Sequence, residues 1–230
     1  MESVTKMFRT LPLSILAFVF VFALLQIQCQ RFSDKKTETE KLSLQPKEGQ
    51  KLAAFAEGCF WCSEHIFESI PGVTEVVSGY AGGHTENPNY ELVNTETTGH
   101  AETVLVYYDP SKIDYAELCR IFFLSHDPTT FHRQGPDEGS SYRSILFYSS
   151  ELELKIAKSI QKEIEKKQIW KNPIVTEYQE LKDFYQAESY HQNFIKNNPN
   201  QSYVQAVSIP RYQEFQSRYN LYRKSLDESK

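Results

Sequence analysis

Five consecutive residues, Gly58-Cys59-Phe60-Trp61-Cys62, restrict the possible folds of this 230-residue chain more than any other feature. The small apolar residues just before them, at 52–56, are typical of a buried strand that ends at Gly58, whereas residues 61–70 have the apolar spacing of a helix. Cys59 is therefore predicted to lie at a strand-to-helix turn, where Gly58 allows a sharp bend because it has no Cβ. Unpaired N–H groups and the helix dipole at such a position favour the thiolate, which is the nucleophilic form of cysteine.

The remaining hydrophobic pattern predicts strands and helices in the order β-α-β-β-α-β-α-β. Strands are expected at 52–56, 73–78, 103–108, 145–148 and 174–178, and helices at 61–70, 114–125 and 151–167. Two long loops, 79–99 and 126–142, hold many polar and aromatic residues. This order favours an α+β fold, a two-layer α/β sandwich with a ferredoxin-like core and long functional loops. Residues after 199 show no clear periodicity and are expected to wrap over the surface.

Four segments are predicted along the chain. They are a signal peptide or membrane anchor at 1–29, a flexible charged linker at 30–50, a catalytic domain at 51–210 and a C-terminal tail at 211–230. The first segment has a basic start followed by an apolar stretch at 15–25, and Cys29 comes shortly after it. Either a lipoprotein modified at Cys29 or an uncleaved anchor fits this pattern, and both imply export to the cell envelope and a membrane tether.

Composition and charge exclude several classes of protein. Apolar residues make up 40% of the chain, enough for one packed core, and the formal net charge of -5 offers no basic surface for nucleic acid. Four cysteines are too few for a small disulfide-stapled domain.

The C-x-x-C spacing by itself leaves three kinds of site open. A structural zinc site would need His65 and Cys119 as further ligands, but Cys119 lies in an apolar helix pattern that favours a core position. A thiol–disulfide oxidoreductase of the cell envelope is a second possibility. The bulky Phe60-Trp61 pair between the cysteines favours a third, in which two aromatic rings beside a thiol form an apolar pocket for a methyl group.

Many further motifs give the chain a family resemblance over about residues 52–210. In chain order they are Gly58-Cys59-Phe60-Trp61, Pro71-Gly72-Val73, Gly79-Tyr80-Ala81-Gly82-Gly83, Asn87-Pro88-Asn89-Tyr90, Thr98-Gly99-His100-Ala101-Glu102, Tyr108-Asp109-Pro110, His126-Asp127-Pro128-Thr129, Gln134-Gly135-Pro136-Asp137, Tyr142-Arg143-Ser144 and Tyr190-His191-Gln192. Together they resemble the A-type peptide methionine sulfoxide reductases. The resemblance implies reduction of methionine S-sulfoxide, free and in proteins, to methionine.

The same resemblance implies the roles of individual residues. Cys59 would attack the sulfoxide sulfur and Glu102 would donate a proton to the oxygen, which requires a carboxyl group with a raised pKa. Tyr90 and Tyr142 would donate hydrogen bonds to the same oxygen. Phe60 and Trp61 would hold the ε-methyl group, and Asp137 would orient substrate or water. Outside the ordered motifs, a single glutamate and two tyrosines would more simply be surface and packing residues.

Two departures from the family concern the recycling of Cys59. The family commonly has glycine where this chain has Cys62, and many members carry recycling cysteines in a C-terminal tail, which residues 200–230 lack. Reduction of the sulfoxide leaves a sulfenic acid on Cys59. We expect Cys62 to resolve it as a disulfide, although direct reduction of Cys59 by an external thiol remains the alternative.

The resemblance also fixes which partners are expected. Reducing equivalents would come from thioredoxin or a thioredoxin-like protein, with oxidised proteins and free methionine sulfoxide as substrates. No metal, no organic cofactor and no nucleic acid are expected, and the protein is predicted to be a monomer. A catalytically inactive lipoprotein that keeps the fold for binding is the alternative from another functional class.

Overall fold

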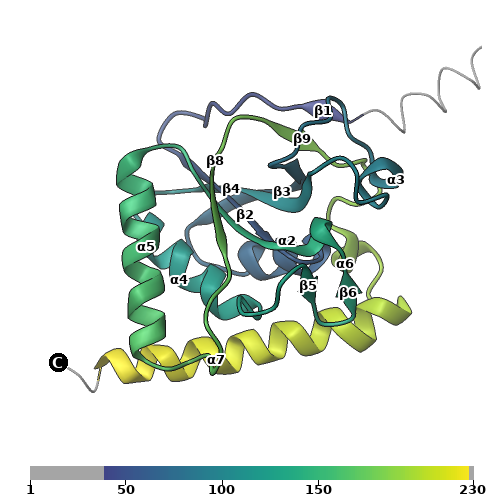
Figure 1. Cartoon of the computed structure of the whole chain (residues 1–230). Coiled ribbons are helices and arrows are strands. Elements are labelled where there is room, and N and C mark those ends of the chain that lie inside the picture. Colours follow the sequence, from purple (N-terminus) through teal and green to yellow (C-terminus); the bar gives the residue numbers. More distant parts are fainter. Residues whose placement is uncertain (1–38, 228–230) are drawn as a thin grey trace, which may run out of the picture. The chain divides into compact units, whose positions relative to one another are not determined.

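The structure is a computed structural model that describes residues 39–227 (Figure 1). The predictions for the N-terminal segment, Cys29 included, therefore lie outside the described residues. Within residues 39–227, no helix is long and apolar enough to cross a membrane.

A seven-stranded mixed sheet forms the centre of the described chain. Its strands are β1 (Glu40–Lys41), β2 (Lys51–Glu57), β3 (Val73–Ala81), β4 (Ala101–Tyr108), β7 (Ser144–Tyr148), β8 (Glu177–Glu180) and β9 (Phe184–Gln186). They lie in the order β1-β9-β3-β4-β2-β7-β8, and all neighbours are antiparallel except β7 and β8. A separate two-stranded hairpin is formed by β5 (Arg133–Gln134) and β6 (Asp137–Glu138).

The helices follow the predicted pattern in the first part of the chain. They are α2 (Phe60–Glu68), α3 (Tyr90–Val93), α4 (Tyr115–Ser125), the 3-10 turn η1 (Ser140–Tyr142), α5 (Glu151–Lys166), α6 (Phe194–Asn197), the π-helical turn η2 (Val204–Ser208) and α7 (Ile209–Asp227). The Asp114 carboxylate accepts the Glu117 N–H at 2.7 Å, which confirms the predicted start of α4. The α+β class is confirmed, and the predicted element order is found from β2 to β8.

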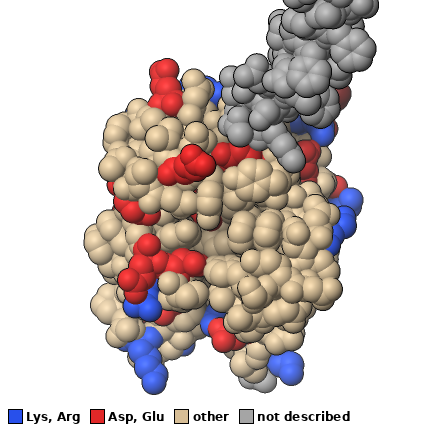
Figure 2. All heavy atoms as spheres, turned by 90° about the vertical axis from the view of Figure 1, so that its right-hand side faces the viewer, with Lys and Arg blue, Asp and Glu red and all other residues tan. Residues whose placement is uncertain are grey.

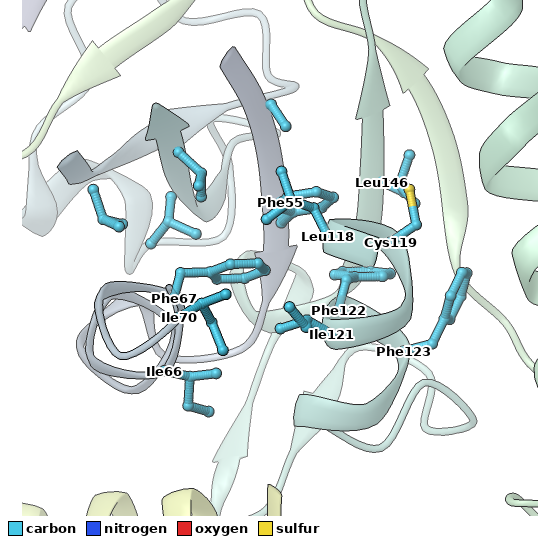
Figure 3. Packing of buried hydrophobic residues seen from close by; sticks show 14 of the residues in the cluster. Phe55, Ile66, Phe67, Ile70, Leu118, Cys119, Ile121, Phe122, Phe123 and Leu146 are labelled. Atoms are coloured by element: carbon cyan, nitrogen blue, oxygen red, sulfur yellow. The ribbon is translucent and has the colours of Figure 1, made fainter. Parts of the chain in front are cut away.

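The sheet is buried on both faces, which explains the continuous apolar run of β2. On one face Phe55 stacks between Phe67 of α2 and Phe122 of α4, with ring centroids 5.0 and 5.4 Å apart (Figure 3). On the other face Ala54 and its neighbours join a second cluster with Phe147 and Phe184. A strand covered on both faces shows no polar alternation.

The predicted flexible linker is wrong for its second half. Strand β1 pairs with β9, and Leu42 and Leu44 pack against the second cluster. These two leucines are separated by one residue, which is the spacing of a segment that lies along a sheet with every second side chain turned inward.

The C-terminal tail is ordered as a helix, which its sequence pattern does not predict. Residues 209–227 form α7, a 19-residue helix that lies beneath α4 and the end of α5 in Figure 1. Its inward positions are filled by aromatic residues at helical spacing, namely Tyr212, Phe215, Tyr219 and Tyr222. Three of these four are tyrosines, whose hydroxyl groups hide the apolar stripe when they are counted as polar.

Candidate active site

Cys59 is the N-cap residue of α2, two residues after the end of β2. Gly58 before it has φ +88°, in the left-handed region, and a Cβ there would lie 2.5 Å from Cβ of Gln134. Only glycine therefore allows this turn, for both conformational and steric reasons. The Cys59 side chain is buried, with 6% of the residue's surface exposed.

A cavity of about 290 Å³ opens beside Cys59. It lies between the start of α2 and residues from β4, α3, β6, η1 and the C-terminal segment, and its lining is Cys59, Phe60, Trp61, Tyr90, Glu102, Asp137, Tyr142, Gln201 and Tyr203. Figure 2 views the molecule from the side of α3, β6 and α6, where the surface is hollowed between acidic side chains. Seven of the eight residues that the sequence analysis singles out thus line one cavity, and the eighth, Cys62, lies one helical turn behind Cys59.

Glu102 projects from β4 and is buried at the wall of this cavity, with 3% of its surface exposed. The backbone N–H of Phe60 donates a hydrogen bond to its Oε2 at 2.9 Å. Burial raises the pKa of Glu102 to about 8, and the nearby charges of Asp137 and Cys62 act in the same direction. At neutral pH the group is a carboxylic acid with a proton to donate.

Separate glutamates hold the segments that carry Tyr90 and Tyr142, two of the three tyrosines that line the cavity. The Glu188 carboxylate accepts the backbone N–H of Tyr90 at 2.9 Å and the hydroxyl of Tyr80 at 3.0 Å, which fixes the start of α3. Glu96 accepts three hydrogen bonds from the Ser140 hydroxyl and from the hydroxyl and N–H of Ser141, at 2.6 to 2.9 Å. These bonds fix the turn that carries Tyr142. Burial raises the pKa of Tyr90 and of Tyr142, so their hydroxyls are donors.

Aromatic contacts hold the Trp61 ring at the cavity. It stacks on Phe194 with centroids 3.7 Å apart, and its indole N–H donates to Nδ1 of His191 at 3.0 Å. Because His191 accepts through Nδ1, its proton is on Nε2, and burial lowers its pKa to about 4. Tyr203 lies edge-on to Trp61 and donates its hydroxyl to Asp137 at 2.5 Å.

The two motif cysteines are both reduced and buried. Burial raises the pKa of Cys59 well above its usual value. The pKa of Cys62 is lowered, first by hydrogen bonding with the Cys59 thiol and also by Arg211 and Ser208. Burial thus opposes a negative charge on Cys59, whereas hydrogen bonding and the charge of Arg211 favour one on Cys62. The thiolate that the helix N-terminus favours on Cys59 stays a prediction.

The zinc alternative finds no site in the described part of the chain, where no three His, Cys, Asp or Glu side chains are grouped to hold a metal ion. Cys119 is fully buried in α4, and burial raises its pKa beyond the usual range.

The family model of peptide methionine sulfoxide reductase matches residues 51–223, about three quarters of the chain. The chain belongs to this family. MsrA 1 of Rhodopirellula baltica is 44% identical over 77% of the chain and 92% of its own length. The reduced form of Mxr1 from Saccharomyces cerevisiae is 38% identical, with a TM-score of 0.64 over 69% of the chain and 94% of that protein. Methionine sulfoxide reductase A of Corynebacterium diphtheriae is 32% identical, with a TM-score of 0.60 over 66% and 77%.

Membership of this family makes the chain a peptide-methionine (S)-S-oxide reductase. The enzyme reduces methionine sulfoxide to methionine. The predicted family resemblance and the predicted activity are both confirmed.

Sequence reasoning missed the residues that the C-terminal segment of this reductase brings to the site. Gln201 and Tyr203 line the cavity, and Ser208 contacts Cys62 with Oγ and Sγ 3.3 Å apart. No motif marks these residues, because they come from a segment without apolar alternation. The helical spacing of the aromatic residues in α7 is the one sequence signal that could have predicted a helix in this part of the chain.

Proposed function

We propose that Cys59 attacks the sulfur of methionine S-sulfoxide while Glu102 protonates its oxygen. One thiol and one sulfoxide then become one sulfenic acid on Cys59 and one methionine. The observation that carries this proposal is the buried Glu102 carboxyl, with its pKa raised to about 8, in the same small cavity as the Cys59 thiol. Negative charge grows on the sulfoxide oxygen during the attack, and the hydroxyls of Tyr90 and Tyr142 would donate hydrogen bonds to it.

In the proposed complex Phe60 and Trp61 bind the ε-methyl group of the substrate. The stacking of Trp61 on Phe194 and its hydrogen bond to His191 support this, because they hold the ring at the cavity wall. Asp137 would orient the substrate through the hydrogen-bonded pair that it forms with Tyr203. A cavity of about 290 Å³ has room for one side chain, in a free amino acid or in a protein.

The proposed second half of the cycle uses Cys62 and a dithiol reductant. Cys62 would attack the Cys59 sulfenic acid and form a disulfide, which thioredoxin or a thioredoxin-like protein would reduce. The Cys62 N–H donates to the Cys59 carbonyl at 3.1 Å, which places the two cysteines in one turn. This spacing and the lowered pKa of Cys62 support the role.

Two further proposals concern architecture and location. We infer that β2, α2, β3, β4, α4 and β7 form the ferredoxin-like core, and their antiparallel order β3-β4-β2-β7 supports this. We also propose that the enzyme acts in the cell envelope, tethered through residues 1–29, on the basis of the basic and apolar pattern of that segment.

The proposed function is tested by two assays on the same preparation. Purified enzyme should reduce dabsyl-methionine S-sulfoxide with dithiothreitol or thioredoxin as reductant, and should leave the R epimer unchanged. Under the same conditions it should not accelerate the reduction of insulin disulfides. Insulin reduction without sulfoxide reduction would instead identify a thiol–disulfide oxidoreductase.

The N-terminal tether gives a separate prediction. The full chain should sediment with membranes, whereas a chain that starts at Thr39 should be soluble and active, because it keeps Leu42 and Leu44 on the sheet. Metabolic labelling with palmitate distinguishes the two anchors. Label that is lost in Cys29→Ala identifies a lipoprotein, and a membrane-bound but unlabelled protein identifies an uncleaved apolar anchor. A full chain found only in the soluble fraction would contradict both.

A further inference from the structure

A buried ion pair lies directly behind the cysteine motif. Glu57, the last residue of β2, is fully buried, and Nη2 of Arg211 from α7 donates to its Oε1 and to its backbone carbonyl, both at 2.9 Å. Nε of Arg211 donates to the carbonyl of Ser125 at 3.1 Å. These three hydrogen bonds fix the position of the guanidinium group. None of the steps proposed above uses this pair, and taking two charges out of water is costly.

The same helical segment reaches Cys62. Ser208, three residues before Arg211, contacts the Cys62 thiol, with Oγ and Sγ 3.3 Å apart. A Cβ built on Gly58 would lie 3.6 Å from Nη1 of Arg211, so the guanidinium lies against the backbone that precedes Cys59. The C-terminal helix therefore presents a hydroxyl and a fixed positive charge to the motif from behind, while the substrate cavity opens in front.

Arg211 differs in charge from the other groups that act on Cys62. Acidic groups act on Cys62 from three strands, namely Glu57 on β2, Glu102 on β4 and Asp137 on β6. Tyr203, just before η2, has a side chain that never carries a positive charge. The buried His126 is neutral because burial lowers its pKa to about 3. Hydrogen bonding with Cys59 and with Ser208 also lowers the pKa of Cys62. Of the groups named here, Arg211 alone is a cation.

We propose that Arg211 is a positioning residue for the recycling of Cys59: its fixed charge keeps Cys62 in the thiolate form that attacks the sulfenic acid. This inference rests on the proposed resolving role of Cys62. In the step itself the Cys62 sulfur forms a bond to the Cys59 sulfur, the S–O bond breaks, and the oxygen leaves as hydroxide, which takes up a proton to become water.

The charge of Arg211 matters most after the sulfoxide has been reduced. In the resting enzyme, hydrogen bonding with the Cys59 S–H is the first cause of the lowered pKa of Cys62. Once Cys59 is a sulfenic acid, this S–H donor no longer exists. Arg211 then remains as the fixed positive charge near the attacking sulfur. Residues 200–230 contain no recycling cysteine, and in this chain they support the recycling of Cys59 electrostatically instead.

The decisive experiment measures Cys62 without turnover. In a Cys59→Ser full chain, serine still offers a hydrogen bond to Cys62, and the rate of Cys62 alkylation by iodoacetamide is followed against pH by peptide mass spectrometry. Arg211→Gln should move the midpoint of this profile upward by about 1 to 2 pH units. Glu57→Gln breaks the same ion pair but leaves the cation, and should move it downward. Arg211→Lys keeps a charge and should stay near the parent profile.

Opposite shifts from the two halves of one ion pair separate an electrostatic role from a structural one. Shifts in the same direction, or no shift in Arg211→Gln, would overturn the proposal. If Arg211→Gln does not fold, the Glu57→Gln variant decides. An upward shift of its alkylation midpoint, or no shift, would contradict the proposal in the same way. With Cys59 present, Arg211→Gln should form the disulfide more slowly at pH 7 and recover at pH 9. Failure of the resolving role itself would appear elsewhere, as a Cys62→Ser enzyme that keeps thioredoxin-driven turnover.

Discussion

Replacing Glu102 by glutamine should lower the rate of sulfoxide reduction by roughly 10²- to 10⁴-fold, the usual loss for a removed general acid. Glutamine keeps the size of the side chain, and its carbonyl oxygen can still accept the N–H of Phe60, so the cavity should keep its shape. Its amide cannot donate a proton to the leaving oxygen. Single-turnover release of methionine, measured with excess enzyme, checks the chemical step, and the substrate dissociation constant should change little. The Cys59→Ser variant serves as the inactive control. It should not reduce the sulfoxide, because a serine hydroxyl does not attack the sulfoxide sulfur.

The pH dependence of the same chemical step provides a second test of Glu102 as the proton donor. Burial raises the pKa of Glu102 to about 8, so the proton-donating form is present below pH 8 and is lost as the pH rises through that value. The wild-type single-turnover rate should therefore fall above about pH 8, and this fall should be absent in Glu102→Gln. Nearly full single-turnover activity in Glu102→Gln would show that another group donates the proton.

The parts of this enzyme that the sequence predicts are those encoded by neighbouring residues. The turn at Gly58, the strand before it and the helix after it are local patterns, and they place Cys59 correctly at the N-cap of α2. Ordered family motifs then identify Glu102, Tyr90 and Asp137, which the fold brings to one cavity from separate elements. The antiparallel pairing of β2 with β4 brings Glu102, near the start of β4, beside the end of β2.

The unpredicted parts depend on contacts between distant residues. Arg211 reaches Glu57 across 154 residues, and no local pattern shows that the two charges meet. The thiolate was expected on Cys59 because a helix N-terminus favours it. In the structure, burial opposes this thiolate, and the charge of Arg211, which α7 brings to Glu57, favours a negative charge on Cys62. The position of a charge within a buried pair is thus a tertiary property, even where the pair itself is visible as a motif.

Replacing Cys62 by serine should separate the two halves of the catalytic cycle. The variant should release one methionine per enzyme in a single turnover, because Cys59 and Glu102 are intact. It should then accumulate a sulfenic acid on Cys59 that reacts with dimedone, and it should lose thioredoxin-driven turnover. Dimedone labelling with mass spectrometry, together with the rate of NADPH consumption in a thioredoxin-coupled assay, measures both effects.

The competing thiol in the described chain is Cys119, and the structure argues against it. It is fully buried in α4 among the core side chains, and burial raises its pKa far above that of a reactive thiol (Figure 3). Cys62 lies one helical turn from Cys59, where the two sulfurs meet with little movement of the backbone. Oxidised wild-type enzyme should therefore contain a Cys59–Cys62 disulfide, and Cys119→Ala should recycle as fast as wild type. A Cys59–Cys119 disulfide, or unimpaired recycling in Cys62→Ser, would instead point to a different resolving thiol or to direct reduction of Cys59 by the external reductant.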